Sequence, residues 1–162
     1  MLSYRAMKQS LEADGHTVKT PEPRKRKRSY EESDNQISFF KWWRATHDDF
    51  HIPECLVYAI PNGSALGTGR EDWQVLQRII RGKRLVAEGL TNGVFDIFVS
   101  VPRIRPHGTW YHGCYLEMKK KDGTVSPAQV TFKAAAEAFC YRTAICYSDR
   151  EAIDCVTTYL TK

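Results

Sequence analysis

Three charged side chains stand inside apolar stretches of this sequence, where charge is costly. Asp96 interrupts the run GVFDIFVSVP, and Glu117 and Lys119 lie two residues apart in WYHGCYLEMK. Side chains two residues apart in a strand leave the same face, about 6.6 Å apart at about 3.3 Å per residue. A carboxylate in apolar surroundings is tolerated when it is paired or binds a metal. These three residues are therefore the first candidates for chemistry.

An acid followed 21 residues later by acid-x-Lys suits metal-dependent cleavage of a phosphodiester. If the two stretches pair as strands, Asp96 and Glu117 lie opposite or diagonal to each other and repel unless a cation lies between them. Carboxylate oxygens with spare water positions suit Mg²⁺, and the Lys119 ammonium can orient an attacking water and offset transition-state charge. A salt bridge from Lys119 to either acid at an exposed strand end explains the same spacing, and the residues alone leave both interpretations open.

The elements that would hold these side chains alternate between helix and strand, which predicts an α/β fold. Helical spacing of apolar residues predicts helices, and short apolar runs bounded by turn residues predict strands. Ser33 or Asp34 is the predicted cap of the first helix, Ser126 of the third, and Ser148 or Asp149 of the last. In chain order the predictions are a helix within 29–49, strand 55–63, helix 69–90, strands 93–102 and 110–119, helix 126–142, strand 143–148 and helix 148–160.

The composition favours one folded domain with no membrane span. The chain has 162 residues, 42% of them hydrophobic, and no apolar run of about 18 residues. Its first residues lack the apolar core of a secretory signal. No two cysteines form a CxxC pair, so we expect reduced thiols in a cytoplasmic protein rather than a zinc site or disulfides. The five are Cys55, Cys114, Cys140, Cys146 and Cys155.

The first 30 residues carry the charge imbalance of the whole chain. They hold eight of the 24 Lys and Arg and three of the 19 Asp and Glu, which accounts for the entire net charge of +5. The run RKRKR follows two prolines, a composition that cannot bury a core. We expect residues 1–30 to form a flexible basic arm and residues 31–162 to form the folded domain. The run fits a solvated tail, a phosphate contact or a nuclear import signal, and all three interpretations stay open.

Four segments in the same order resemble one nuclease family. AIPNG, LVAEGLTNGVFDIFV, YHGCYLEMKKKDGTVSPAQ and a final EAIDCVTTYL are similar to the virus-type replication-repair nuclease domain (VRR-NUC), a branch of the PD-(D/E)xK nuclease superfamily. The resemblance covers about residues 31–160. It implies a restriction-endonuclease-like core, in which a small mixed sheet is flanked by helices. Family members usually read Gly-Val-Pro-Asp where this chain has Phe95 before Asp96, so the acid is kept and the proline is lost.

The resemblance also implies roles for individual residues. Asp96 and Glu117 would bind Mg²⁺, with Mn²⁺ as a substitute, and Lys119 would handle the attacking water. Glu32 resembles the helix glutamate that completes the metal site, with its neighbour Glu31 as the other choice. The glutamines Gln36 and Gln129 would face the site, and Gln129 is counted with the catalytic residues.

Further residues are candidate DNA contacts. His112 could contact phosphate or act as a base partner, and Asn62 in the AIPNG turn could touch substrate. Two basic clusters could line a channel for phosphates. They are Arg70, Arg78, Arg81, Lys83 and Arg84 in the second helix, and Lys119, Lys120 and Lys121 at the strand end.

The function that these features predict is a Mg²⁺-dependent, structure-specific DNA endonuclease that resembles Holliday junction resolvases. A junction has paired scissile strands, so we expect a homodimer acting on branched DNA. Apolar residues of FFKWW and Trp73 are the material for its interface. The alternative is a non-catalytic DNA-binding or inhibitor protein that kept the fold, and a sequence-specific restriction-type nuclease is a third. The family resemblance suggests a phage origin, so the cytoplasm would be that of a host cell.

Overall fold

The computed structural model describes residues 31–61, 72–104, 108 and 110–161. The predicted N-terminal arm and the predicted DNA contacts Asn62 and Arg70 lie outside these residues, and the side chain of Arg78, a further predicted contact, is likewise not described. The boundary between arm and domain therefore stays a prediction.

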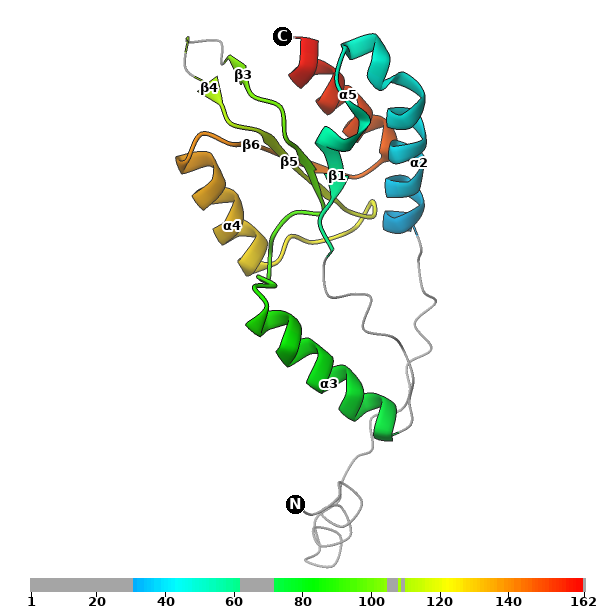
Figure 1. Cartoon of the computed structure of the whole chain (residues 1–162), viewed down its shortest axis with the longest axis vertical. Helices are drawn as coiled ribbons and strands as arrows, with labels where there is room; N and C mark the ends of the chain where they lie inside the picture. The colour runs from blue at the N-terminus through cyan, green and yellow to red at the C-terminus, as the bar shows by residue number, and fades with distance from the viewer. Residues whose placement is uncertain (1–30, 62–71, 105–107, 109, 162) are drawn as a thin grey trace, which may run out of the picture.

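A four-stranded mixed sheet forms the centre of the fold (Figure 1). Its strands lie in the order β1-β2-β5-β6, with antiparallel pairing throughout except between β5 and β6, which are parallel. A separate hairpin of β3 and β4 occupies the connection from β2 to β5. The strands are β1 (Val57–Ala59), β2 (Ile97–Val99), β3 (Arg103–Ile104), β4 (Trp110–Tyr111), β5 (Cys114–Met118) and β6 (Arg142–Cys146).

Helices cover both faces of this sheet, which confirms the predicted mixed α/β class. In Figure 1, α2 and α5 lie together on one side of the sheet and α4 lies on the other. Helix α3 projects away from the sheet. Among the described helices, none has both the length and the apolar composition to cross a bilayer. The α-helices are α2 (Glu31–Thr46), α3 (Asp72–Ala87), α4 (Pro127–Ala138) and α5 (Asp149–Thr161), and short 3₁₀ helices span His47–Phe50 and Glu54–Leu56.

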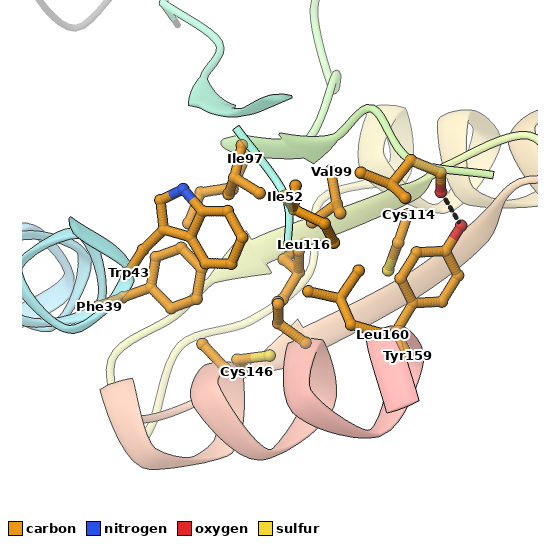
Figure 2. Close-up of a cluster of buried hydrophobic side chains, with 14 of the residues drawn as sticks. Phe39, Trp43, Ile52, Ile97, Val99, Cys114, Leu116, Cys146, Tyr159 and Leu160 are labelled. Carbon is orange, nitrogen blue, oxygen red and sulfur yellow. Dashed lines mark hydrogen bonds between the residues drawn. The ribbon is translucent and has the colours of Figure 1, made fainter. Parts of the chain in front are cut away.

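The apolar core lies between the sheet and the pair α2 and α5 (Figure 2). Phe39 and Trp43 from α2 are fully buried, and they pack with buried side chains of β2 and β5 such as Leu116. Tyr159 of α5 joins them and donates its hydroxyl hydrogen to the Val101 carbonyl at 2.6 Å. FFKWW and Trp73 were expected to include apolar residues beyond the needs of the core. Phe39 and Trp43 of FFKWW are instead fully buried in the core, whereas Trp73 is exposed.

Local signals set some boundaries correctly and miss others. Ser126 and Ser148 cap α4 and α5 as predicted, and each hydroxyl accepts a backbone N–H of the first turn. Helix α2 is already formed at Glu31, so the predicted caps two and three residues later are wrong. All five cysteines are free thiols in this structure.

Candidate active site

The pairing register brings the two predicted metal acids to the same end of the sheet. Ile97 of β2 pairs with Leu116 of β5, so Asp96 stands opposite Glu117 one position further on. Asp96 lies just before β2, and its Oδ2 accepts the backbone N–H of Met118 at 3.0 Å. Opposed residues of an antiparallel pair share a face of the sheet. Both carboxylates therefore belong to the α4 face, away from the apolar core.

Glu117 is a buried carboxylate with one oxygen bonded and one oxygen left over. Its Oε1 pairs with the Lys119 ammonium at 2.8 Å and accepts the side-chain N–H of Gln129. Its Oε2 is buried and has no hydrogen-bond partner. The side chains of Lys119 and Glu117 are only 13% and 3% exposed, so this ion pair is not the solvated strand-end salt bridge that the spacing alone allowed.

Negative charge dominates the electrostatics around this pair. Burial raises the pKa of Glu117 above its usual value, and the charges of Asp96 and Glu32 raise it further against the opposing effect of Lys119. Burial alone would lower the pKa of Lys119, but its bond to Glu117 and the two other carboxylates outweigh burial, so its pKa is raised. Lys119 is therefore an ammonium at neutral pH. Three carboxylates act on one lysine, which leaves the site short of positive charge.

Gln129 is fixed by the start of α4. Its side-chain oxygen accepts the N–H of Ser126 at 2.9 Å, while its own backbone N–H bonds to the Ser126 hydroxyl at 3.3 Å. This reciprocal cap leaves the side-chain NH₂ to donate to Glu117. The helix start therefore holds the bonded oxygen of Glu117 in place and leaves the other oxygen free.

A close backbone contact joins α4 to the chain that leads into Asp96. Gly93 has φ +86°, and a Cβ placed on it would lie 2.4 Å from the carbonyl carbon of Ala128. Only glycine fits that approach. The next residues are bulky: Phe95 is fully buried and its ring lies 5.3 Å from that of Phe132. This packing fixes the segment just before Asp96, a contact that the sequence did not reveal.

Two glutamates in the first turn of α2 form hydrogen bonds with the chain that follows β5. Glu32 Oε1 accepts the backbone N–H of Lys120 at 3.1 Å, and Glu31 Oε1 accepts that of Lys121 at 3.5 Å. The two glutamates, which the sequence offered as alternatives, thus act together to hold the chain that follows Lys119. Gln36, one turn further along α2, is partly buried.

Other predicted contacts lie apart from this end of β5. His112 is exposed and precedes β5 at the opposite end of the strand, with its ring 5.7 Å from that of Tyr141. It stands five residues before Glu117, about 16 Å along a strand. Arg81, Lys83 and Arg84 are exposed on α3. The structure therefore brings together Asp96, Glu117, Lys119 and Gln129, with Glu32 at the margin and Lys120 and Lys121 exposed beside them.

The chemistry of the donor set fits a hard divalent cation. A buried carboxylate oxygen without a partner is unusual and costly, and a cation would satisfy it. Asp96 and Glu117 supply the oxygen ligands that Mg²⁺ prefers. Within the described residues, no three His, Cys, Asp or Glu side chains already form a metal-binding cluster. The cation would therefore draw its remaining ligands from water, substrate or a movement of Glu32.

The fold is similar to that of a solved structure. No family model matches the sequence, and a search of curated proteins finds no similar sequence. Among solved structures, a VRR_NUC domain protein aligns with a TM-score of 0.60 at 16% identity, covering 82% of this chain and 89% of its own. This similarity confirms the expected fold, a mixed sheet flanked by helices as in the VRR_NUC neighbour.

Proposed function

We propose that this protein is a metal-dependent endonuclease that hydrolyses phosphodiester bonds of branched DNA, with Mg²⁺ as the cofactor and Mn²⁺ as a substitute. The observation that carries the proposal is the buried, unpartnered Oε2 of Glu117, opposite Asp96 and beside the Lys119 ammonium. A salt bridge kept for stability alone has no reason to leave that oxygen unsatisfied. The fold similarity to a VRR_NUC domain protein supports the same class.

The residues divide the work between holding the metal and handling the water. Asp96 and Glu117 would hold the Mg²⁺, which when bound lowers the pKa of water and offsets charge on the phosphate. Lys119 is charged and held 2.8 Å from Glu117, so it can donate hydrogen bonds to the attacking water or a phosphate oxygen. Gln129 keeps Glu117 in one orientation. Glu32 supports the chain after Lys119 and is the further carboxylate whose charge acts on both Glu117 and Lys119.

The substrate is proposed from charge and symmetry. Lys120 and Lys121 are exposed beside the acids, and the arm of residues 1–30 adds eight cations that can contact phosphates. Phosphate contacts position a protein without reading sequence. A junction needs two cuts related by a two-fold axis, so we propose that a homodimer is the active form.

Cleavage of defined substrates tests the proposal. The full-length protein is incubated with a four-way junction and with a linear duplex of the same sequence, each with Mg²⁺ and with EDTA. We expect cleavage of the junction in Mg²⁺ and none in EDTA. Binding without cleavage in Mg²⁺ or Mn²⁺ would favour the non-catalytic alternative, and sequence-dependent cutting of the linear duplex would favour a restriction-type nuclease.

A further inference from the structure

A hollow lined by aromatic rings lies between α4 and the sheet, on the same face of the sheet as the candidate active site. Its volume is about 240 Å³. Tyr115 of β5 forms one wall and stands two residues before Glu117, so the two side chains leave one face of the strand about 6.6 Å apart. The lining residues are Tyr115, Phe132, Ala135, Ala136, Phe139 and Tyr141.

The residue pattern of α4 explains why there is space at this place. Residues 132, 135, 136 and 139 fall within an arc of about 100° on the helix and its C-cap, so they form one stripe. The stripe faces the sheet, because the ring of Phe132 lies 5.0 Å from that of Tyr115. Phenylalanines stand at both ends of the stripe and alanines in the middle. The small side chains therefore leave a gap that the two aromatic rings border.

The C-terminal end of α4 fixes another wall of the hollow. Cys140 has φ +60° and its N–H bonds to the Glu137 carbonyl at 3.2 Å, while the N–H of Tyr141 bonds to the Ala136 carbonyl at 2.9 Å. This is the Schellman motif, in which the second residue after the C-cap packs against the last turn of the helix. The ring of Tyr141 is held in this way 5.4 Å from the ring of Tyr115.

The hollow is preformed and opens to solvent at Phe139. This ring is 74% exposed, the highest value among the large apolar side chains of the described residues. The other aromatic walls belong to a strand, a helix and a capped turn, so a ligand would find them already in place. Preorganised walls lower the cost of binding, and apolar, aromatic hollows are typical of ligand sites.

We propose that this hollow binds one unpaired nucleobase of the strand held at the candidate active site, an inference that takes DNA as the ligand from the proposed function. Bases stack on aromatic side chains whatever their sequence, because every base has a π-face. The volume of about 240 Å³ is below the range of about 300–1,000 Å³ that holds drug-sized ligands, so it has room for a base while the sugar and phosphate stay outside.

The position of the hollow along α4 places this base close to the cleaved bond. Gln129, which bonds to Glu117, precedes Ala136 by seven residues, or about 10.5 Å along the helix. Successive nucleotides of one stacked strand are about 3.4 Å apart along the axis. The bound base therefore lies about three nucleotides from the acids, and fewer if the strand is extended. His112, whose ring is 5.7 Å from that of Tyr141, can contact the backbone of the same nucleotide.

Charge around the hollow favours an uncharged ring over a cationic ligand. Glu137, the acid of this turn of α4, is already paired with Lys133 and accepts the hydroxyl hydrogen of Thr143. Its carboxylate is therefore not free to attract a cation into the hollow. The inference narrows the branched substrate to DNA with unpaired nucleotides beside the cleaved bond, because a paired base would first have to leave its stack.

Binding of two oligonucleotides by the metal-free protein tests the inference. Fluorescence anisotropy in EDTA compares a thymidine dodecamer with an abasic dodecamer, which has the same phosphates and no bases. The variants are Ala135→Leu, which fills the hollow, and Phe139→Ala, which removes its exposed wall. Ala134→Leu is the control, because Ala134 is exposed on the opposite side of α4. We expect the wild type and the control to prefer the thymidine strand by at least about fivefold, the effect of stacking one base, and the other two variants to lose most of this preference.

Unfolding curves separate loss of base binding from loss of folding. Ala135 and Phe139 are exposed, so both variants should keep the unfolding transition of the wild type. Equal affinity of the wild type for the two strands would overturn the inference, as would a preference that survives in Ala135→Leu and Phe139→Ala or is lost in Ala134→Leu. A wild type that prefers neither strand and binds tetramethylammonium in the hollow would replace the base by a cationic ligand.

The outcome is independent of the cleavage assay. Because binding is measured without metal, absence of cleavage in Mg²⁺ would remove the nuclease proposal and leave base binding in place. Loss of the thymidine preference would remove base binding and leave the nuclease proposal in place.

Discussion

The two faces of the central sheet are built from alternate residues of the same strands and have opposite properties. On the α2 and α5 face, Ile97 and Leu116 are fully buried in an apolar core. On the α4 face, the neighbouring positions are Asp96, Glu117 and Lys119, where one buried oxygen lacks a partner. Successive side chains of a strand point to opposite faces. Under the proposed function, one face provides stability while the other gives up some of it for chemistry.

The largest expected effect is on catalysis at the α4 face. Lys119→Ala should reduce cleavage by about 10³-fold, since a charged donor in a buried site acts on the transition state, and DNA binding should stay close to that of the wild type. Lys41→Ala is the control, because its side chain is exposed on α2 and lies outside the proposed site. Single-turnover cleavage and a binding assay are measured for both. If Lys119→Ala cuts at the wild-type rate, the ion pair is structural only.

Substitutions at two adjacent residues on opposite faces of the sheet test the difference between those faces directly. Leu116→Ala should lower the free energy of unfolding by about 2–5 kcal/mol, the usual cost of emptying a core site. Glu117→Gln should leave stability equal or higher, because the raised pKa of Glu117 means that the folded protein favours the uncharged form of this side chain, yet it should abolish cleavage. Denaturant unfolding without metal measures both variants. A Glu117→Gln variant as unstable as Leu116→Ala would show that both faces serve the fold.

The free energy of unfolding should depend on pH in the way expected for a buried carboxylate whose pKa is raised. The pKa of Glu117 is raised in the folded protein, so the folded state holds a proton that the unfolded state has released. In the window above its ordinary value of 4.5, the metal-free protein should therefore lose stability as pH rises toward the raised pKa. Glu117→Gln should lack this loss. Unfolding of the two proteins across this range gives the difference, and parallel curves would contradict the assigned shift.

The smallest expected effect concerns the helix start that orients the site. Gln129→Ala removes the hydrogen bond to Glu117 and should weaken metal binding by about 10–100-fold, as loss of an orienting partner usually does. Ser126→Ala removes the cap and should cost about 1 kcal/mol of stability. Titration with Mn²⁺ measures the first variant and unfolding measures the second. Unchanged metal affinity in Gln129→Ala would limit its role to the cap.

Much of the α4 face could be predicted from the sequence, because its determinants are local. The two-residue spacing of Glu117 and Lys119 places them on one face, and one hairpin connection brings Asp96 across from Glu117. The Ser126 cap follows from the same kind of short-range signal. Family resemblance then singled out Gln129, and the structure shows what holds its side chain.

Long-range packing accounts for what the sequence could not predict. FFKWW was expected to hold more apolar residues than the core needs, because nothing local shows that α2 lies on the sheet and buries Phe39 and Trp43. An amphipathic pattern predicts helix α3 but is the same whether a neighbour covers its apolar face or not. The absence of a hydrogen-bond partner for Oε2 of Glu117 likewise results from the packing of three separate segments. It was therefore visible only once β5, α4 and the chain before β2 were in place.

Metal binding to Glu117 tests the central claim most directly. Mn²⁺ is titrated calorimetrically into the wild-type protein and into Glu117→Gln at a pH above the raised pKa of Glu117. The proposed site predicts a binding isotherm for the wild type and a loss of affinity of at least about tenfold in the variant, since the buried oxygen is a first ligand. Equal binding by the two proteins, or no binding by the wild type, would contradict the account.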